Sequence, residues 1–279
     1  MGCAPLIRVT GCKFKITFFI WLSLAVALVG CGRAATPPPS VTLTVFAAAS
    51  LTEAFTELGQ RFEAEYPEAT VVFNFGGSNQ LAEQINQGAP ADVFASAGPK
   101  PLDAVIQSGR IAAAAPQTLA RNRLVIIFPA ANPAGLTALS DLARPGLKVV
   151  LAAQEVPAGQ YALDFLDKAA HADAYGAGFK TDVLQNVVSY EENVKVVFTK
   201  VALGEADAGI VYTSDVRGDG AQAVGRLEIP DALNTIATYP MAALRDSPQP
   251  ALAQAFVELA RSAAGQEILG RYGFLPANP

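Results

Sequence analysis

The sequence is short of the side chains on which most enzyme chemistry depends. Its 279 residues contain 1 His, 3 Cys and 1 Trp. The single histidine, His171, lies in the polar stretch "AAHADAYG", where an exposed position in a loop or at a helix end is expected rather than a catalytic one. The sequence also lacks a G-x-S-x-G elbow, a P-loop and a dinucleotide-binding glycine motif. We therefore expect no catalytic residue, no cofactor and no site for a bare metal cation.

Charged residues are also scarce, at 16% of the chain, and no basic run follows the N-terminal segment. A nucleic-acid-binding surface requires clustered Lys and Arg, so no nucleic-acid partner is expected. The 51% of hydrophobic residues is ample for a buried core and unlike a disordered chain. The adjacent carboxylates Glu191 and Glu192 should point apart, which favours a solvated or capping role over acid–base chemistry.

The N-terminal segment has the pattern of a secretion signal. Three basic residues precede the apolar run "ITFFIWLSLAVALVG", which is too short for a comfortable membrane span. Residues 1–30 are therefore predicted to be a lipoprotein signal peptide. The run ends in "LVGC", residues 28–31, which resembles a bacterial lipobox in which Cys31 carries a lipid. A plain signal peptide or a membrane anchor is the alternative. Residues 31–40, "CGRAATPPPS", would form a short tether stiffened by proline.

Cleavage of this segment would change the composition of the domain. The net charge would move from −5 to −8, because Arg8, Lys13 and Lys15 leave with the signal. Cys3 and Cys12 would leave as well, and the lipid would occupy the remaining cysteine. The mature domain would then have no disulfide, no thiol nucleophile and no thiolate metal site.

From Ser40 onward, strand and helix patterns alternate. Apolar or alternating runs predict strands at 41–49, 70–75, 91–98, 123–129, 148–153, 208–214 and 237–244. Helical spacing predicts helices at 51–66, from 78, and at 101–109, 160–170, 194–206 and 251–273, the last with a break near Gly265. Such alternation indicates parallel or mixed sheets with helices on both faces. No linker marks a domain boundary.

Four of the strand-to-helix junctions carry a small or polar residue at the point where a helix begins. These are Ser50, Ser78, the stretch "VPAGQY" and the stretch "ENVKVV". Helix N-termini present unpaired N–H groups and the positive end of the helix dipole, and they bind anions without a cationic side chain. Four of them directed at one point would form a neutral cage for an oxyanion.

Helix capping is the alternative explanation for the same residues. "SLTE", residues 50–53, has the S-x-x-E spacing of a capping box. Ser78 or Asn79 could cap the second helix, and Pro157 suits the first turn of the third. The pattern alone leaves both interpretations open.

Longer strings resemble a known family. "VFAAASLTEAF", "FGGSNQLAEQINQGAPADVFASA", "VPAGQYA", "GEADAGIVYTSD" and "RYGF" are similar to the molybdate-binding proteins, the substrate-binding subunits of molybdate ABC transporters, from residue 41 to about 275. The resemblance implies an α/β, two-lobed periplasmic binding protein fold of type II-like architecture. Each lobe would be a mostly parallel sheet with helices on both faces, and two crossover strands would join the lobes. Lobe one would comprise 41–123 plus 237–279, and lobe two 124–236.

The same resemblance implies five residues that hold a tetrahedral oxyanion. Hydroxyl groups would come from Ser50, Ser78 and Tyr212, and backbone N–H groups from Ala158 and Val194. This sequence departs from the family's serine-rich string at the second serine, which follows Gly76–Gly77 and precedes Asn79–Gln80.

The function that the resemblance implies is extracytoplasmic binding of molybdate, and of tungstate, with hinge closure and delivery to a membrane permease. The protein would be a monomer held at the bacterial cell membrane, on its periplasmic face or the cell surface, by the lipid on Cys31. Two alternatives remain. One is a receptor for sulfate or a small organic anion on the same fold, and the other is an enzyme or sensor domain built on it.

Overall fold

The structure is a computed structural model that describes residues 41–277. The predicted signal peptide, the tether and Cys31 lie outside the described residues. All of the described residues belong to one structural unit of the chain, which begins at Pro38. Within this described part, no helix is both long enough and apolar enough to cross a membrane.

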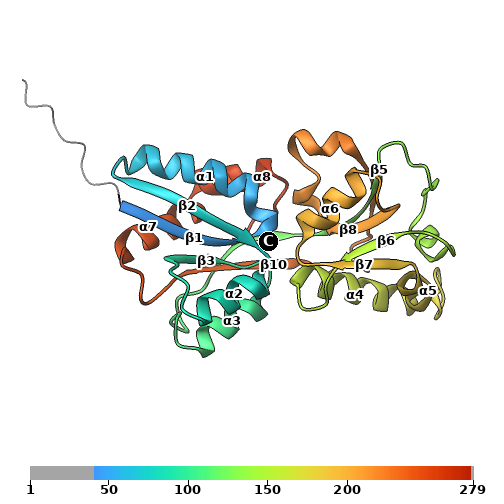
Figure 1. The fold of residues 1–279 in the computed structure, drawn as a ribbon, viewed down its shortest axis with the longest axis horizontal. Helices are drawn as coiled ribbons and strands as arrows, with labels where there is room; N and C mark the ends of the chain where they lie inside the picture. The colour runs from blue at the N-terminus through green and yellow to red at the C-terminus, as the bar shows by residue number, and fades with distance from the viewer. Residues whose placement is uncertain (1–40, 278–279) are drawn as a thin grey trace, which may run out of the picture. The chain divides into compact units, whose positions relative to one another are not determined.

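The described chain forms two five-stranded sheets (Figure 1). The strand order in the first is β2 (Ala69–Gly76), β1 (Val41–Ala48), β3 (Val93–Ala95), β10 (Ala237–Ala243) and β4 (Gln117–Asn122). The order in the second is β7 (Val187–Glu191), β6 (Val149–Ala152), β8 (Ala208–Tyr212), β5 (Leu124–Pro129) and β9 (Val224–Glu228). In each sheet one strand, β10 or β5, runs against the other four. Each sheet is therefore mixed, which refines the expectation of mostly parallel sheets.

Helices cover both faces of each sheet, as the alternating pattern predicts (Figure 1). On the first sheet, α1 (Thr52–Glu65), α7 (Pro250–Arg261) and α8 (Ala263–Arg271) lie opposite α2 (Ser78–Asn86) and α3 (Pro99–Gln107). On the second, α6 (Val194–Ala202) lies opposite α4 (Pro157–Ala170) and α5 (Phe179–Gln185). Short 3₁₀ turns complete the chain: η1 (Ala49–Leu51), η2 (Leu139–Ala143), η3 (Thr213–Asp215) and η4 (Gly218–Ala223).

The alternation of side chains along β1 explains why both faces of the first sheet are covered. Val45 and Phe46 point to opposite faces and belong to two different clusters of buried residues. On the α1 side, the ring of Phe256 packs edge-on against Phe55 and Phe62, with centroids 5.8 and 5.4 Å away. Burial of each such ring contributes roughly 1.5–3 kcal/mol, so these contacts hold α1 firmly against α7.

The chain passes between the two sheets twice. The first passage is the single residue Arg123, between β4 and β5, and the second is 229–236, between β9 and β10. Asn234 joins the two passages, because its Oδ1 accepts from the N–H of Leu124 at 3.1 Å and its Nδ2 donates to the Leu124 carbonyl at 2.9 Å. The two connections therefore lie side by side.

Several element boundaries differ from the sequence-based expectation, among them the start of α4 at Pro157 and the end of β8 at Tyr212. The strand expected over 91–98 has only three residues. The break in the closing helix comes at Ser262 rather than Gly265, because the Ser262 hydroxyl accepts from the Gly265 N–H and caps α8.

Candidate functional site

The starts of four helical elements meet at one small pocket. Its lining comes from the starts of η1, α2, α4 and α6 and from the end of β8. It includes all five residues singled out in the sequence: Ser50, Ser78, Ala158, Val194 and Tyr212. Within the part of the chain that the structure describes, no Asp, Glu, Lys, Arg or His lines it.

Ser50 does not cap a helix. It lies in η1, and α1 begins only at Thr52 with no side-chain capping bond. The buried Ser50 hydroxyl instead lies 2.9 Å from the hydroxyl of Tyr239, in β10. The capping-box interpretation of "SLTE" is therefore wrong, because Ser50 and Glu53 both have other partners.

Ser78 is the first residue of α2 and is likewise not its cap. Gly77 occupies the capping position, and the Ser78 hydroxyl oxygen accepts from the N–H of Ala97 at 3.0 Å. A serine hydroxyl has one proton, and this bond does not use it. Ser78 is buried at the pocket wall, so its proton is available to a ligand there.

Tyr212 ends β8 with its hydroxyl buried and without a hydrogen-bond partner among the described residues. An unsatisfied buried hydroxyl costs about 1–3 kcal/mol, so an acceptor in the pocket would remove a real penalty. Burial above all raises the pKa of Tyr212 well beyond its ordinary value, with Tyr239 adding to the effect. The phenol therefore stays protonated and offers a donor to the pocket.

The start of α6 leaves one particular N–H free. The Asn193 side chain caps this helix, and its Oδ1 accepts from the N–H groups of Lys195 at 3.0 Å and Val196 at 3.2 Å. Val194, the first residue of the helix, is not served by this cap and lines the pocket. Its N–H is one of the orphan donors that every helix start presents.

The start of α4 supplies a second backbone donor by a different arrangement. Val156 occupies the capping position without a side-chain bond, and Pro157 has no N–H. Ala158 is thus the first residue of α4 with an N–H to offer. Gly159 allows the close approach behind it, since a Cβ there would lie 2.1 Å from the Ala153 carbonyl oxygen, just past the end of β6.

Charged groups lie beside the pocket but outside its lining. The Lys195 ammonium lies 3.5 Å from Asp215 Oδ1, and the Tyr212 N–H donates to Asp215 Oδ2 at 3.0 Å. Burial raises the pKa of Asp215 to about 6, although Lys195 acts in the opposite direction. Burial also works to lower the pKa of Lys195, but Asp215 and Glu53 outweigh it and raise this pKa, so the ammonium remains charged.

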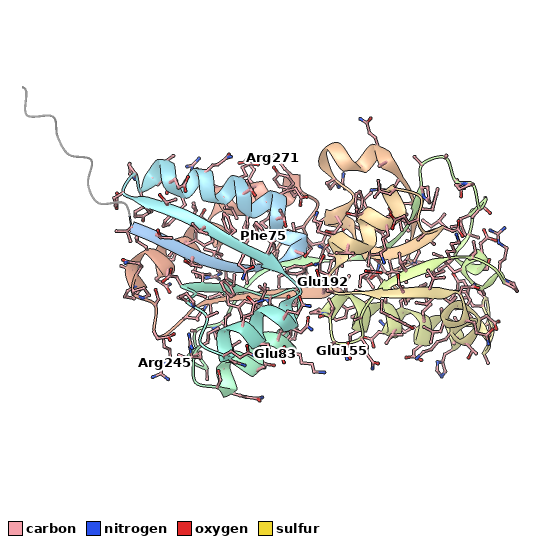
Figure 2. The ribbon with its side chains drawn as sticks, in the orientation of Figure 1. Phe75, Glu83, Glu155, Glu192, Arg245 and Arg271 are labelled. Carbon is pink, nitrogen blue, oxygen red and sulfur yellow. The ribbon has the colours of Figure 1, made fainter. Side chains whose placement is uncertain are left out.

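Elements from the two sheets touch beside the pocket. A Cβ on Gly77 would lie 2.4 Å from the backbone carbonyl oxygen of Glu192, so only glycine fits this approach. The Gln80 amide also donates to the Glu192 carboxylate at 3.4 Å; Figure 2 labels Glu192 near the end of β2. The departure "GGSNQ" from the family's serine-rich string thus lies at the contact between a helix of the first sheet and the segment before α6.

Two other sequence candidates have ordinary structural roles. His171 is exposed at the end of α4, with Nδ1 2.7 Å from the Asp167 carbonyl, as expected. Glu191 and Glu192 point apart, as expected, and Glu192 is exposed. The expected solvated or capping role is wrong for Glu191, whose carboxylate is buried and pairs with Lys200 at 2.6 Å. Residues 41–277 contain no cluster of three or more His, Cys, Asp or Glu suited to a metal ion.

Sequence reasoning missed Tyr239 and Asn122, which lie behind Ser50. Tyr239 bonds to Ser50, and Asn122 donates to Tyr239 at 3.4 Å. Both side chains are fully buried. The only available signal was a polar residue within an apolar strand, "ATYPMAAL" for Tyr239, and this does not identify the partner.

The fold has two sheets with helices on both faces, and helix starts from both sheets form one small pocket. These two features define a class of ligand-binding protein. The chain matches the family described as "Bacterial extracellular solute-binding protein" over residues 43–275. It belongs to this family, whose members bind solutes outside the cytoplasm. The family and the solved structures below also confirm the predicted fold class.

The relatives carry more specific names. The molybdate-binding protein ModA of Mycobacterium tuberculosis strain H37Rv is 40% identical, with 90% of this chain and 94% of that protein covered. A putative ABC transporter substrate-binding lipoprotein, YvgL of Bacillus subtilis strain 168, is 29% identical, with 93% and 98% covered. These names agree with the resemblance seen in the sequence.

Two solved structures share the fold. The periplasmic molybdate-binding protein of Azotobacter vinelandii aligns with a TM-score of 0.72 at 20% identity, covering 84% of this chain and 98% of that one. The sulfate-binding protein SubI of Mycobacterium tuberculosis aligns with a TM-score of 0.74 at 18% identity, covering 86% and 88%. At these identities the likeness concerns the fold alone.

Proposed function

We propose that this chain binds molybdate, and also tungstate, outside the cytoplasm and delivers it to the permease of an ABC transporter. The observation that carries the proposal is the buried Tyr212 hydroxyl, which has no acceptor among residues 41–277 and lines a pocket to which these residues contribute no charged side chain. A fully deprotonated tetrahedral oxyanion is an acceptor on every side, so it satisfies such a lining. The 40% identity to a protein named for molybdate binding supports the choice of ion.

Five donors would hold the ion. Three are the hydroxyls of Ser50, Ser78 and Tyr212, and two are the N–H groups of Ala158 and Val194. The helix starts add a partial positive charge without a cation, each worth about 0.3–1 kcal/mol or more when buried. Phosphate keeps a proton at neutral pH, and that proton would face a donor, at a cost of about 1–3 kcal/mol or more. We therefore expect phosphate to be rejected.

Hinge closure around the ion is the proposed mechanism of capture. Lobe one would be 41–123 plus 237–279, and lobe two 124–236. Each lobe supplies part of the donor set, with Ser50 and Ser78 on one and Ala158, Val194 and Tyr212 on the other. The hinge would be the two neighbouring passages, at Arg123 and 229–236, where a few residues can absorb the rotation.

Sulfate is the second candidate ligand. A sulfate-binding protein of Synechococcus elongatus is 24% identical over 87% of this chain, and a donor-only pocket accepts any deprotonated tetrahedral dianion. Sulfate is smaller than molybdate, so it would leave some donors stretched and bind more weakly. Molybdate and tungstate are nearly equal in size, and the pocket offers no basis for preferring one.

We also propose that the chain acts without catalysis, as a monomer, and is held at the membrane by a lipid on Cys31. The lipobox-like "LVGC" supports anchoring, and the relative YvgL is named a lipoprotein. Metabolic labelling with a fatty acid tests this. Wild type should be labelled and membrane-bound, and Cys31→Ser should be neither. Equal labelling of the two would contradict the anchor.

Thermal unfolding with an anion panel tests the ligand. An ion at a thousand times its dissociation constant adds about 4 kcal/mol, which is roughly 8–16 °C for a domain of this size. We expect a large shift with molybdate and tungstate, a small one with sulfate and none with phosphate. Ser50→Ala and Ser78→Ala should each weaken binding roughly ten- to a hundredfold, and exposed Ser108→Ala should not. A phosphate shift equal to that of molybdate would contradict the proposal.

A further inference from the structure

Resting on the proposed function, we infer that Asn122 and Tyr239 are positioning residues that fix the direction of the hydrogen bond at Ser50. They force the Ser50 hydroxyl to donate into the pocket, and so make the site selective for anions that carry no proton. Neither residue lines the pocket. Their effect on a ligand is exerted through Ser50.

The direction of this chain of bonds begins at the amide of Asn122. Its Oδ1 accepts from the backbone N–H of Arg123 at 2.9 Å, and a backbone N–H can only donate. The Thr213 hydroxyl donates to the same oxygen at 2.9 Å. This end of the amide is therefore the oxygen, and the opposite end is the NH₂ group. The side chain is fully buried, so no water competes for these bonds.

The two amide protons of Asn122 have one acceptor each. Nδ2 lies 2.8 Å from the Ser214 hydroxyl oxygen and 3.4 Å from the Tyr239 hydroxyl oxygen. An amide nitrogen cannot accept, so Tyr239 must be the acceptor in the second bond. Its own proton is then free to point elsewhere.

The Tyr239 proton points to Ser50. The two hydroxyl oxygens lie 2.9 Å apart, and either could donate if the pair stood alone. Among the described residues, Asn122 and Ser50 are the hydrogen-bond partners of the Tyr239 hydroxyl, and the Asn122 amide nitrogen cannot accept. If Ser50 were the donor, the Tyr239 proton would have no acceptor, so Tyr239 donates to Ser50. Burial, as the main cause, raises the pKa of Tyr239 well above its ordinary value, which keeps that proton in place. Ser50 thus accepts from Tyr239, and its own proton, which has no acceptor among the described residues, is left for a ligand in the pocket.

The Ser78 hydroxyl is also directed to donate into the pocket, and a single hydrogen bond is enough to direct it. The Ala97 N–H donates to its oxygen at 3.0 Å, and the Ser78 proton, which has no acceptor among the described residues, is left for a ligand in the pocket. The lone Tyr212 phenol has no acceptor elsewhere among the described residues. All three hydroxyls then act as donors, and a protonated anion would bring one donor too many. Selectivity therefore depends on buried residues that never touch the ion.

The test reverses the direction of the hydrogen bonds that run from Asn122 through Tyr239 to Ser50, which we call the relay. In Asn122→Asp both side-chain oxygens accept, so Tyr239 would donate to the new carboxylate and accept from Ser50. Ser50 would then present a lone pair to the pocket. Four neighbouring donors, from Arg123, Thr213, Ser214 and Tyr239, favour the ionised form of that carboxylate. Tyr239→Phe, a smaller change, cuts the relay and leaves Ser50 free to turn either way.

The readout is the ratio of dissociation constants for sulfate and hydrogen phosphate, measured by calorimetry at mildly alkaline pH. Both ions carry two negative charges there, so the added charge of Asn122→Asp weakens both alike and cancels in the ratio. We expect the preference for sulfate to fall by about tenfold or more in Asn122→Asp, and by a smaller factor in Tyr239→Phe. Tyr66→Phe is the matched control, because it removes a phenol about 20 Å along α1 from the pocket and should leave the ratio unchanged.

Each outcome decides the inference. An unchanged ratio in folded Tyr239→Phe and Asn122→Asp, with folding checked by unliganded thermal unfolding, would overturn it. If Asn122→Asp does not fold, the ratio for Tyr239→Phe decides alone. Hydrogen phosphate binding as tightly as sulfate to the wild type would also overturn it. If the wild type binds sulfate but not molybdate, the proposed function fails, whereas a shifted ratio in the variants would still support the relay.

Discussion

Lys195 of α6 and Glu53 of α1 form an ion pair that joins the two halves of the structure beside the pocket. The ammonium lies 2.8 Å from each carboxylate oxygen of Glu53. Each residue is close in sequence to a proposed ligand donor, Val194 or Ser50. The pair therefore joins the two helix starts that a bound molybdate ion would contact.

A double-mutant cycle measures what this pair contributes to binding. With side-chain exposures of 27% for Lys195 and 46% for Glu53, solvent screens the attraction considerably. Combining Lys195→Met and Glu53→Gln should give a coupling of about 0.2–1 kcal/mol in the molybdate binding free energy at low salt, and less at high salt. A coupling of zero at low salt would mean that the pair forms equally well without ligand.

Tyr212→Phe should weaken binding and leave the stability of the unliganded protein nearly unchanged. In the open state that the proposed hinge implies, water can reach the Tyr212 hydroxyl at the pocket, and the change removes no hydrogen bond to another described residue. The same change removes a donor to the ion and should weaken molybdate binding by roughly ten- to a hundredfold. Unliganded thermal unfolding and calorimetric titration check the two effects. Unchanged affinity would place the ion away from this phenol.

Proline at Val194 tests a backbone donor without breaking its helix. Val194 is the first residue of α6, a position where proline is well tolerated. Val194→Pro removes the N–H and should weaken molybdate binding about tenfold or more, while Val194→Ala keeps the N–H and most of the affinity. Circular dichroism confirms that both variants fold. Equal affinities in the two would show that a neighbouring N–H makes the contact.

The free energy of unfolding should change with pH because Asp215 binds its proton more tightly in the folded protein. Burial raises its pKa from 3.8 to about 6, so the folded protein binds this proton more tightly than the unfolded chain. The resulting stabilisation is complete below about pH 4 and is lost as the pH rises through 6. It is on the order of 3 kcal/mol.

Asp215→Asn removes this pH dependence. The Tm of the variant minus that of wild type should therefore be larger above pH 7 than near pH 4, by up to roughly 6–12 °C. Asp103→Asn, which removes an exposed carboxylate on α3, is the control substitution. A Tm difference for Asp215→Asn that does not vary with pH would mean that Asp215 ionises as it does in the unfolded chain.

Elements with strong periodicity could be predicted from the sequence, and elements with mixed composition could not. The apolar run at β5 and the spaced apolar residues of α1 are found where expected. No strand is evident in the sequence at β7, because "VVSYE" ends in a carboxylate whose burial depends on Lys200, a residue of α6. Local pattern carries no information about such a partner.

The site residues likewise divide into those that the local sequence indicates and those that it does not. Helix starts are local features, so Ser50, Ser78, Ala158 and Val194 could be proposed from the junctions and the family strings. The choice between capping and ligand binding at Ser50 could not be made, because it depends on Tyr239, 189 residues away in the chain. The direction of that bond depends in turn on Asn122, in another strand. Tertiary contacts alone decide what the serine offers to a ligand.

A crystal structure with tungstate, located by its anomalous scattering, tests the central claim most directly. We expect one strong peak in the pocket, with oxygen atoms within hydrogen-bond distance of the Ser50, Ser78 and Tyr212 hydroxyls and of the Ala158 and Val194 N–H groups. The same crystals soaked in phosphate should show no ion there. A tungstate peak elsewhere on the protein, or none in the pocket at saturating tungstate, would contradict the account.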